Sequence, residues 1–373
     1  MENFTQLGVR PQYIKAIKEL NIVKPTNIQS QVIPVLLQNS TDLIAQAQTG
    51  TGKTAAYGLP LLHKIDPKKK DVQGLILCPT RELGQQIAKQ LFKFTKYSDK
   101  IFTEAVFGGA QIEPQISALK RPTQIIVATP GRLIDLIKRK AVNLNKVKTV
   151  ILDEADEMLS MGFKKELNEI LSSLPAIENK WLFSATMPDG IRNIVKRHLS
   201  KKAHRIEINK KSQVNRNIDH QFLICEENEK LHVLIQMLNS DPQARGVVFC
   251  KTKTAAQTLA KQLTAKNIAT DAIQGDLKQV ERDKVMRAFK NKSLRILVAT
   301  DLAARGIDVE GLSFVVHYQL PDKDEYYTHR SGRTARAGNR GISLSIITPT
   351  EIKQIRYFEK ALGISFKQIR RTK

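Results

Sequence analysis

Short apolar runs without alternation recur along the chain, and the clearest four form two matching pairs. The segment 74–78 is matched by 246–250, and the segment 125–129 by 296–300, at nearly the same separation in sequence. Unbroken apolar runs are typical of strands that are buried on both faces of a parallel sheet. Residues with helical periodicity follow the runs, among them Leu83, Ile87, Leu91, Leu259 and Leu263. The pattern predicts a duplicated α/β unit, in which each copy is a mainly parallel sheet flanked by helices.

A polar, basic stretch separates the two copies. Residues 201–217 contain several lysines and little apolar periodicity, so we expect the linker there. The chain has 373 residues, more than one hydrophobic core usually serves. We therefore expect two domains, residues 1–208 and residues 209–373.

The composition points to a polyanionic partner. Lys and Arg number 60 against 36 Asp and Glu, a formal charge of +24, and the excess is spread over both halves. This favours contact of both domains with one nucleic acid, although a generally basic, soluble surface is the alternative. No apolar run approaches membrane-spanning length and the first residues do not form a signal peptide, so we expect a cytoplasmic protein without a membrane partner. The three cysteines are far apart in sequence and lack metal-ligand spacing, so we expect them to be reduced thiols.

A glycine-rich loop over residues 47–54 is a candidate phosphate site. Gly50 and Gly52 allow the backbone to curl so that its N–H groups point at a polyphosphate, and the helix that follows adds its positive end. Lys53 supplies a charge for the outer phosphates, and the Thr54 hydroxyl is a ligand for Mg²⁺. The strict motif has glycine where Ala47 stands, so the loop alone leaves nucleotide binding open.

A cluster of carboxylates follows the apolar run 150–152. Magnesium takes few protein ligands, so Asp153, acting partly through water, would complete a site with Thr54. Glu154 is then available to position and deprotonate an attacking water, as a hydrolase requires. The alternative is a solvated acidic helix start, which the helix dipole favours.

The second copy has no such loop and offers arginines instead. Arg333 and Arg336 lie three residues apart, on one face if the stretch is helical. A guanidinium stabilises charge on a transferring phosphoryl group, an effect worth on the order of 10³ to 10⁵ in rate. The alternative is a basic helix face that only binds backbone phosphate.

These segments together resemble the DEAD-box RNA helicases of superfamily 2, in order and spacing, over essentially the whole chain. The resemblance implies two RecA-like domains and a compact core of bacterial type without a long tail. It implies that Phe4 packs on adenine and that Gln29 bonds its edge. The expected nucleotide-binding residues are Phe4, Gln29, Ala47, Gln48, Thr49, Gly50, Thr51, Gly52, Lys53, Thr54, Asp153, Gly306 and Asp308.

The same resemblance implies RNA contacts and a coupling segment. The RNA-binding residues would be Pro79, Arg81, Gly108, Gly109, Thr129, Arg132, Gly275, Arg282 and Thr300. The residues that link hydrolysis to strand separation would be Asp156, Ser184, Thr186 and His329. Backbone N–H groups, hydroxyls and arginines contact phosphate and sugar without reading the base, so binding should be independent of sequence. Gly84, Ser331 and Ala335 depart from the residues common in the family.

The expected activity is that of an ATP-dependent RNA helicase that locally unwinds short duplexes or remodels ribonucleoprotein. ATP and Mg²⁺ would be its cofactors, Lys53, Glu154, Arg333 and Arg336 its catalytic residues, and closure of the two domains would accompany RNA-stimulated hydrolysis. We expect a monomer with RNA as its partner, and protein partners in RNA decay or ribosome assembly. A nucleotide-gated RNA clamp with negligible turnover and a DNA-directed motor are the alternatives.

Overall fold

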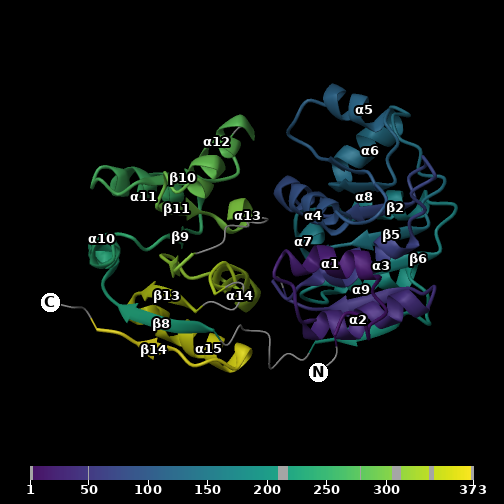
Figure 1. The fold of residues 1–373 in the computed structure, drawn as a ribbon. Coiled ribbons are helices and arrows are strands. Elements are labelled where there is room, and N and C mark those ends of the chain that lie inside the picture. The colour runs from purple at the N-terminus through teal and green to yellow at the C-terminus, as the bar shows by residue number, and fades with distance from the viewer. Residues whose placement is uncertain are drawn as a thin grey trace. The chain divides into compact units, whose positions relative to one another are not determined.

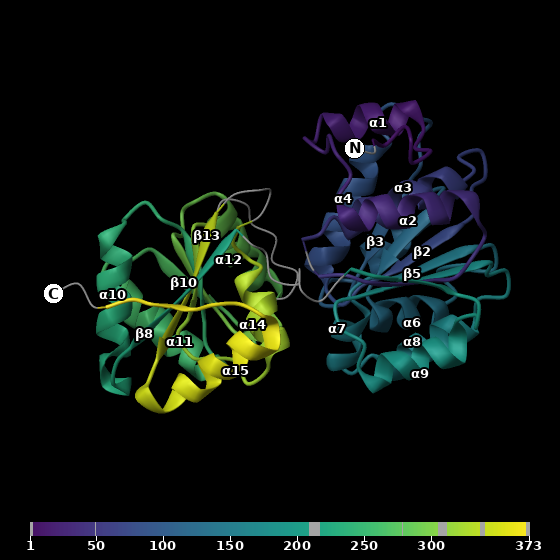
Figure 2. The same cartoon turned by 90° about the horizontal axis from the view of Figure 1, so that it is seen from below.

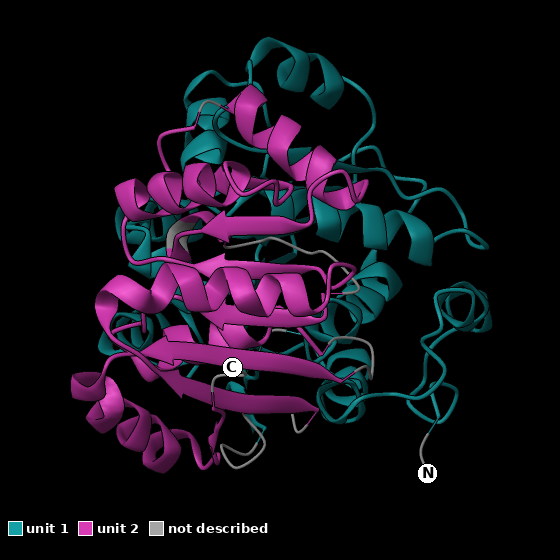
Figure 3. Cartoon of the chain, turned by 90° about the vertical axis from the view of Figure 1, so that its left-hand side faces the viewer, with its two compact units in different colours: residues 1–208 teal, residues 209–373 magenta. Residues whose placement is uncertain are grey.

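The computed structural model describes residues 3–48, 50–208, 217–277, 279–304, 312–335 and 340–370. The chain divides into two compact units, Met1–Ile208 and Asn209–Lys373 (Figure 3). We describe each unit by itself. Within the described ranges no helix has the length and apolar character needed to cross a membrane.

Unit 1 is a parallel sheet of seven strands in the order β3-β4-β2-β5-β6-β1-β7 (Figure 1). Its strands are β1 (Leu43–Gln46), β2 (Gly74–Leu77), β3 (Thr103–Val106), β4 (Ile125–Ala128), β5 (Thr149–Leu152), β6 (Asn179–Ser184) and β7 (His204–Glu207). Its helices are α1 (Pro11–Lys18), α2 (Asn27–Gln38), α3 (Lys53–Lys64), α4 (Arg81–Phe94), α5 (Glu113–Leu119), α6 (Pro130–Lys138), α7 (Ala155–Ser160), α8 (Lys164–Ser172) and α9 (Asp189–His198).

Helices cover both faces of this sheet, which explains the unbroken apolar runs. Figure 2 shows α1 to α4 on one face and α6 to α9 on the other. Alternate residues of one strand enter different cores: Ile76 packs under α1 to α4, whereas Leu75 and Leu77 pack under the other layer. All three are fully buried. A strand buried on both sides has no polar positions to alternate with apolar ones.

Unit 2 repeats this arrangement, with its seven strands in the order β10-β11-β9-β12-β13-β8-β14. Its strands are β8 (Ile218–Ile224), β9 (Gly246–Phe249), β10 (Thr270–Ile273), β11 (Ile296–Ala299), β12 (Phe314–His317), β13 (Gly341–Ile347) and β14 (Lys367–Gln368). Its helices are α10 (Lys230–Ser240), α11 (Lys253–Thr264), α12 (Gln279–Lys290), α13 (Asp301–Ala304), α14 (Asp324–Ser331) and α15 (Ile352–Leu362).

The duplication predicted from the apolar runs is confirmed by the two sheets. The paired runs are β2 with β9 and β4 with β11, and each pair occupies the same place in its sheet. Even the helix starts correspond, since the hydroxyls of Thr80 and Thr252 accept N–H groups of the first turns of α4 and α11.

The linker prediction is wrong in its first part. His204–Glu207 lies inside the stretch assigned to the linker, yet it forms β7, which pairs in parallel with β1. Its residues are mostly exposed because β7 is an edge strand, so it carries no apolar run. Residues 209–216 lie outside the described part of the chain.

Candidate active site and RNA-contact segments

The phosphate loop connects β1 to α3, at the carboxyl edge of the unit 1 sheet. Gly50 and Gly52 have φ values of 79° and 91°, in the left-handed region that favours glycine. A Cβ at Gly52 would lie 2.4 Å from Nε2 of Gln29, so a larger residue would have to displace the Gln29 amide. Gly52 is therefore fixed by both conformation and space.

The side chain of Lys53 is buried within this loop. It is 6% exposed, and its Nζ donates a hydrogen bond of 3.2 Å to the carbonyl oxygen of Ala47. Oε1 of Gln48 is also buried and has no hydrogen-bond partner in the described part of the protein. A buried acceptor without a partner is costly. The loop thus holds a buried cation and one unsatisfied buried acceptor, as a ligand site can.

Asp153 follows β5 and lies beside the loop. It is 2% exposed, and its carboxylate accepts hydrogen bonds from the Tyr57 hydroxyl at 2.8 Å and from the Glu154 N–H at 3.0 Å. Burial raises the pKa of Asp153, and the positive charge of Lys53 opposes that rise. The alternative of a solvated acidic helix start is wrong for this residue, because its carboxyl is enclosed.

The oxygen donors of Thr54 and Asp153 suit Mg²⁺, which prefers hard ligands. No group of three or more His, Cys, Asp or Glu side chains that could hold a metal occurs among the described residues.

Glu154 has an unusual backbone. Its φ and ψ are both 51°, in the left-handed region, where it precedes the first turn of α7. Such a conformation costs a residue other than glycine on the order of 1 kcal/mol, and strain of this kind clusters at functional sites.

Asp156 joins this cluster to the end of β6. Its Oδ2 accepts hydrogen bonds from both the N–H and the hydroxyl of Thr186, each at 2.8 Å. The Ser184 hydroxyl accepts the Asp156 N–H at 3.2 Å and donates to the carbonyl oxygen of Thr186 at 2.7 Å. The three residues form one network, which the sequence predicted only as a coupling segment.

Gln29 ties its segment to the phosphate loop. Its Nε2 donates to the carbonyl oxygen of Gly52 at 3.1 Å, and its Oε1 accepts the Thr26 N–H at 2.9 Å. Gln29 and Phe4 are both 2% exposed, and Phe4 packs in the core of unit 1, so neither offers open surface to an adenine in this structure. The adenine contacts expected of the two residues stay predictions.

The predicted RNA contacts of unit 1 gather at the ends of β3 and β4. The Gly108 N–H donates to the Thr129 hydroxyl at 3.3 Å, and Arg132 donates through Nη2 to the carbonyl oxygen of Ala110 at 2.8 Å. Nε and Nη1 of Arg132 are buried and have no partner among the described residues. Gly109 has a φ of 75°. A guanidinium with unused donors is suited to a phosphate.

Pro79 and Arg81 lie at the end of β2. Pro79 is buried, and the guanidinium of Arg81 lies 4.7 Å from the ring centroid of Phe107. That cation–π contact holds Arg81 near the segment that carries Gly108.

Unit 2 brings its own predicted contacts to the carboxyl edge of its sheet. Arg282 of α12 donates to the carbonyl oxygen of Ala303 at 2.7 Å, so it lies beside the segment that begins at Thr300. Gly275 is exposed in the turn after β10. Gly306 and Asp308, expected to hold ribose and phosphate, lie outside the described residues, as does Thr49 of unit 1.

The arginine segment is not one continuous helix. The helix α14 ends at Ser331, so Arg333 follows its last turn and donates through Nε to the carbonyl oxygen of His329 at 3.2 Å. A shared helix face for Arg333 and Arg336 is expected only if the stretch is helical, and at Arg333 it is not. Arg336 itself lies outside the described residues.

Comparisons with known proteins agree with this geometry. Residues 26–194 match the DEAD/DEAH box helicase family, and residues 229–338 match the helicase conserved C-terminal domain. The DEAD-box ATP-dependent RNA helicase CshA of Bacillus cereus is 42% identical over 360 residues, which cover 96% of this chain and 68% of that protein. The chain belongs to the DEAD-box helicase family. The CshA of Geobacillus kaustophilus is also 42% identical, with 76% of its length covered.

Solved structures show the same two-unit fold. Saccharomyces cerevisiae Dbp5 bound to RNA and ADP BeF3 matches with a TM-score of 0.90 at 30% identity, over 99% of this chain and 96% of that one. Mss116p bound to single-stranded RNA and AMP-PNP matches with a TM-score of 0.87 at 28% identity, over 100% of this chain and 80% of that one. The prediction of two tandem RecA-like domains is thus confirmed, and as a DEAD-box helicase the chain binds ATP.

Two further residues of this DEAD-box helicase were missed by the sequence analysis. Arg330 is 1% exposed and forms a bidentate ion pair with Asp301, at 2.5 Å through Nε and 2.7 Å through Nη2. Its Nη1 donates to the carbonyl oxygen of Gln319 at 2.7 Å, and its guanidinium lies 5.1 Å from the ring centroid of Phe249. The pair ties α14, which precedes Arg333, to the start of α13. The sequence places Asp301 next to Thr300 and Arg330 near Arg333, but it does not show that Asp301 and Arg330 pair.

Ser331, which departs from the apolar residue common in the family, has a partner network in this helicase. Its hydroxyl lies 2.9 Å from Ser343 Oγ and 3.3 Å from His317 Nε2. The Tyr327 hydroxyl is also hydrogen-bonded in this network, to Ser343 Oγ at 3.2 Å and to His220 Nδ1 at 2.7 Å. The departure is therefore matched by polar neighbours in the core of unit 2.

Proposed function

We propose that this DEAD-box helicase hydrolyses ATP when RNA is bound, and that it uses closure of its two units to separate short RNA duplexes or remodel ribonucleoprotein. The main support is the division of chemistry between the units. Unit 1 carries the phosphate loop and carboxylates, and unit 2 carries the arginine segment. The match to Dbp5 with RNA and ADP BeF3 over nearly the whole chain supports the same conclusion.

In the first unit, we assign the phosphates of ATP to the loop and to Lys53. The N–H groups at the start of α3 would face the same anion, because a helix begins there. Mg²⁺, held by Thr54 and through water by Asp153, would neutralise charge on the phosphates. Lys53 would exchange its bond to the Ala47 carbonyl for a phosphate oxygen.

Glu154 would position the attacking water and accept its proton. It lies in the strained turn at the start of α7, next in sequence to Asp153, whose carboxylate is bonded to Tyr57. General bases of this kind contribute about 10² to 10⁴ in rate.

Arg333 and Arg336 would stabilise the charge that develops on the transferring phosphoryl group. The buried pair of Arg330 with Asp301 holds the helix that leads into Arg333, so it would position that side chain rather than touch ATP. Closure of the units would then be required for turnover.

RNA would bind through backbone contacts in both units. Arg132, with two buried and unpartnered nitrogens, is the strongest candidate for a phosphate contact in unit 1. The network of Asp156, Ser184 and Thr186 would carry the state of the ATP site to the end of β6. We further propose that the protein acts as a monomer and meets protein partners in RNA decay or ribosome assembly.

The test is the ATPase rate of the wild type and of Glu154→Gln, each with and without single-stranded RNA. We expect RNA to stimulate the wild type, and the variant to lose about 10² to 10⁴ in rate while it still binds RNA. Glu178→Gln, which changes an exposed partner of Lys148, is the matched control and should retain activity. Equal wild-type rates with and without RNA would exclude the coupled mechanism. An absence of wild-type turnover would favour the clamp, and equal competition by DNA would favour the DNA-directed motor.

A further inference from the structure

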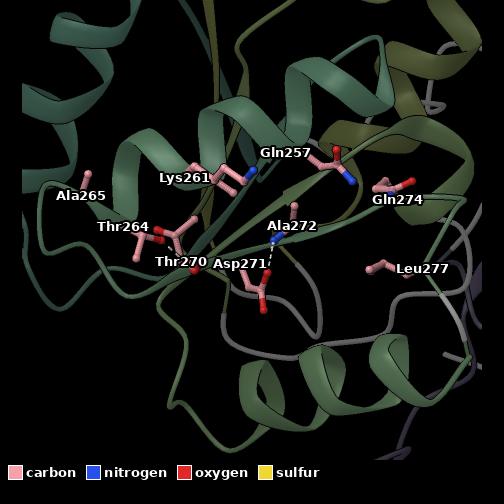
Figure 4. A pocket seen from close by; sticks show the side chains of 10 residues that line it. Gln257, Lys261, Thr264, Ala265, Thr270, Asp271, Ala272, Gln274 and Leu277 are labelled. Carbon is pink, nitrogen blue, oxygen red and sulfur yellow. Dashed lines mark hydrogen bonds between the residues drawn. The ribbon is translucent and has the colours of Figure 1, made fainter.

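A cavity of about 600 Å³ lies in unit 2 between α11 and the edge strand β10 (Figure 4). Its walls also include Gln274 and Leu277, which flank Gly275 and Asp276 in the turn after β10. The volume lies within the range of about 300 to 1,000 Å³ that is typical of ligand sites. Two of its lining residues, Gln274 and Leu277, thus flank Gly275, to which we assign an RNA contact.

One polar stripe of α11 runs along this cavity. Lys253, Gln257, Lys261 and Thr264 are spaced by three or four residues, so they share a helix face. Lys253 forms an ion pair with Asp276, and its Cε lies 3.2 Å from where a Cβ of Gly275 would be. The stripe thus begins at the Gly275 turn and leads away from it along the groove.

The groove has one cation that can meet a phosphate. Lys261 is the lysine among the residues that line the cavity, and Lys253, beside the Gly275 turn, is paired with Asp276. Asp271 is the acidic residue among those that line the cavity, and its Oδ1 already accepts the Ala272 N–H at 2.7 Å. Gln257 and Lys261 are exposed and hence accessible to a ligand.

A buried hydroxyl in the cavity has no partner. Thr270 is 8% exposed, and its Oγ1 lacks a hydrogen bond among the described residues. A hydroxyl can both donate and accept, as can the 2′-hydroxyl and base edges of single-stranded RNA. Glutamine amides such as that of Gln257 pair readily with base edges. The lining therefore offers both a phosphate-binding charge and groups for a nucleotide.

The edge of β10 is poorly suited to an added peptide strand. The carbonyl oxygen of Thr270 accepts the Thr264 hydroxyl at 3.2 Å, and the Ala272 N–H is bonded to Asp271. Strand addition depends on backbone groups that are available at the edge. Two of them are occupied here by side chains, which favours RNA over an extended protein segment.

We propose that the groove between α11 and β10 is an accessory RNA site, which takes a nucleotide of the strand beyond the segment held at Gly275. The site rests on the proposed function, since it extends the RNA track of a helicase. Lys261 would contact a phosphate, and Gln257 and Thr270 would contact the sugar or base.

The test compares the affinities of two single-stranded RNAs, of about six and about twelve nucleotides, in the presence of ADP and BeF3. The variant Gln257→Ala/Lys261→Ala removes one amide and one charge from the cavity. Gln262→Ala/Lys266→Ala makes the same chemical change at exposed residues of the same region that do not line it. We expect the cavity variant to bind the longer RNA about fivefold more weakly, and its salt dependence to fall by about one phosphate contact. The shorter RNA should distinguish the variants by less than about twofold.

A second measurement does not depend on substitution. A photoreactive uridine placed at successive positions of the longer RNA should crosslink to residues 257–274 of the wild type from one flanking position. Equal losses for both double variants, or for both RNA lengths, would overturn the accessory site, as would crosslinks confined to other segments. If the wild type shows no RNA-stimulated ATPase at all, the proposed function fails instead, so the two failures can be told apart.

Discussion

The buried ion pair of Arg330 with Asp301 should carry much of the stability of unit 2. The guanidinium is 1% exposed, so the variant Asp301→Ala would leave a buried charge without its bidentate partner. Breaking such a pair costs about 3 to 5 kcal/mol. Asp301 is 27% exposed, and Arg330 keeps its bond to Gln319 and its contact with Phe249, so the lower value applies. We expect a loss of about 3 kcal/mol in the free energy of unfolding of unit 2.

The assay is urea unfolding of the full chain, followed with two probes. The chain has one tryptophan, Trp181, which is buried in β6 of unit 1. Its fluorescence therefore reports on unit 1, whereas far-ultraviolet circular dichroism reports on both units. With a slope of about 2 kcal/mol per M, the unit 2 transition should move by about 1.5 M. Because each unit has its own core, the Trp181 transition should stay in place.

The matched control is Asp322→Ala, which removes the partner of Lys251. That ion pair is short, at 2.6 Å, but its side chains are 41% and 80% exposed. Pairs of this kind contribute about 0 to 1 kcal/mol. If Asp301→Ala shifts the unit 2 transition no further than this control does, the reasoning from burial is refuted.

Three other changes test the site and the core. Thr186→Val removes one of the two bonds to Asp156, so we expect ATP hydrolysis to continue while duplex separation, measured by strand displacement, falls about tenfold. Tyr57→Phe removes the hydroxyl that orients Asp153, so the Mg²⁺ concentration for half-maximal ATPase should rise about tenfold. Burial lowers the pKa of His220 from 6.5 to about 4. Between pH 4 and pH 6.5, therefore, His220 is protonated in the unfolded chain and neutral in the folded unit. The stability of unit 2 should be complete above pH 6.5 and fall by about 3 kcal/mol toward pH 4, and His220→Gln should flatten the urea midpoint measured against pH.

Each of these changes has a control of the same chemical kind. Thr186→Ser keeps the hydroxyl and should keep strand displacement. Tyr13→Phe removes another buried hydroxyl, bonded to the carbonyl oxygen of Leu62, and should leave the Mg²⁺ dependence unchanged. His232 is exposed, so His232→Gln should preserve the pH dependence. Displacement that is equal in the valine and serine variants, a Mg²⁺ dependence that Tyr57→Phe does not alter, or a pH profile that His220→Gln leaves steep would each contradict its prediction.

The central strands could be predicted from the sequence and the edge strands could not. The strands β2, β4, β9 and β11 are fully buried on both faces, so their apolar runs are unbroken. The edge strands β7 and β14 have exposed or half-buried residues, and no periodic pattern marks them. The hydrogen bonds that make them strands come from a neighbour distant in sequence.

The candidate site residues follow from residue type and order, because phosphate binding favours glycines and a lysine within one short loop. Their partners could not be predicted in the same way. The bonds of Tyr57 to Asp153 and of Arg330 to Asp301 join elements far apart in the chain. Only the order of strands in each sheet brings those elements together. Phe4 shows the converse, since its residue type suited a base whereas its burial in the core does not.

In the proposed mechanism, the left-handed turn at Glu154 sets the need for a carboxylate against the stability of the backbone at a single position. Glycine would adopt its φ of 51° without a steric penalty, so the backbone alone would be more comfortable with a residue that has no carboxylate. Selection for stability alone would therefore favour glycine in place of Glu154, and the product would bind ATP without the proposed general base. A carboxylate at this position is what the proposed role of Glu154 requires, and it comes with a backbone conformation that costs on the order of 1 kcal/mol.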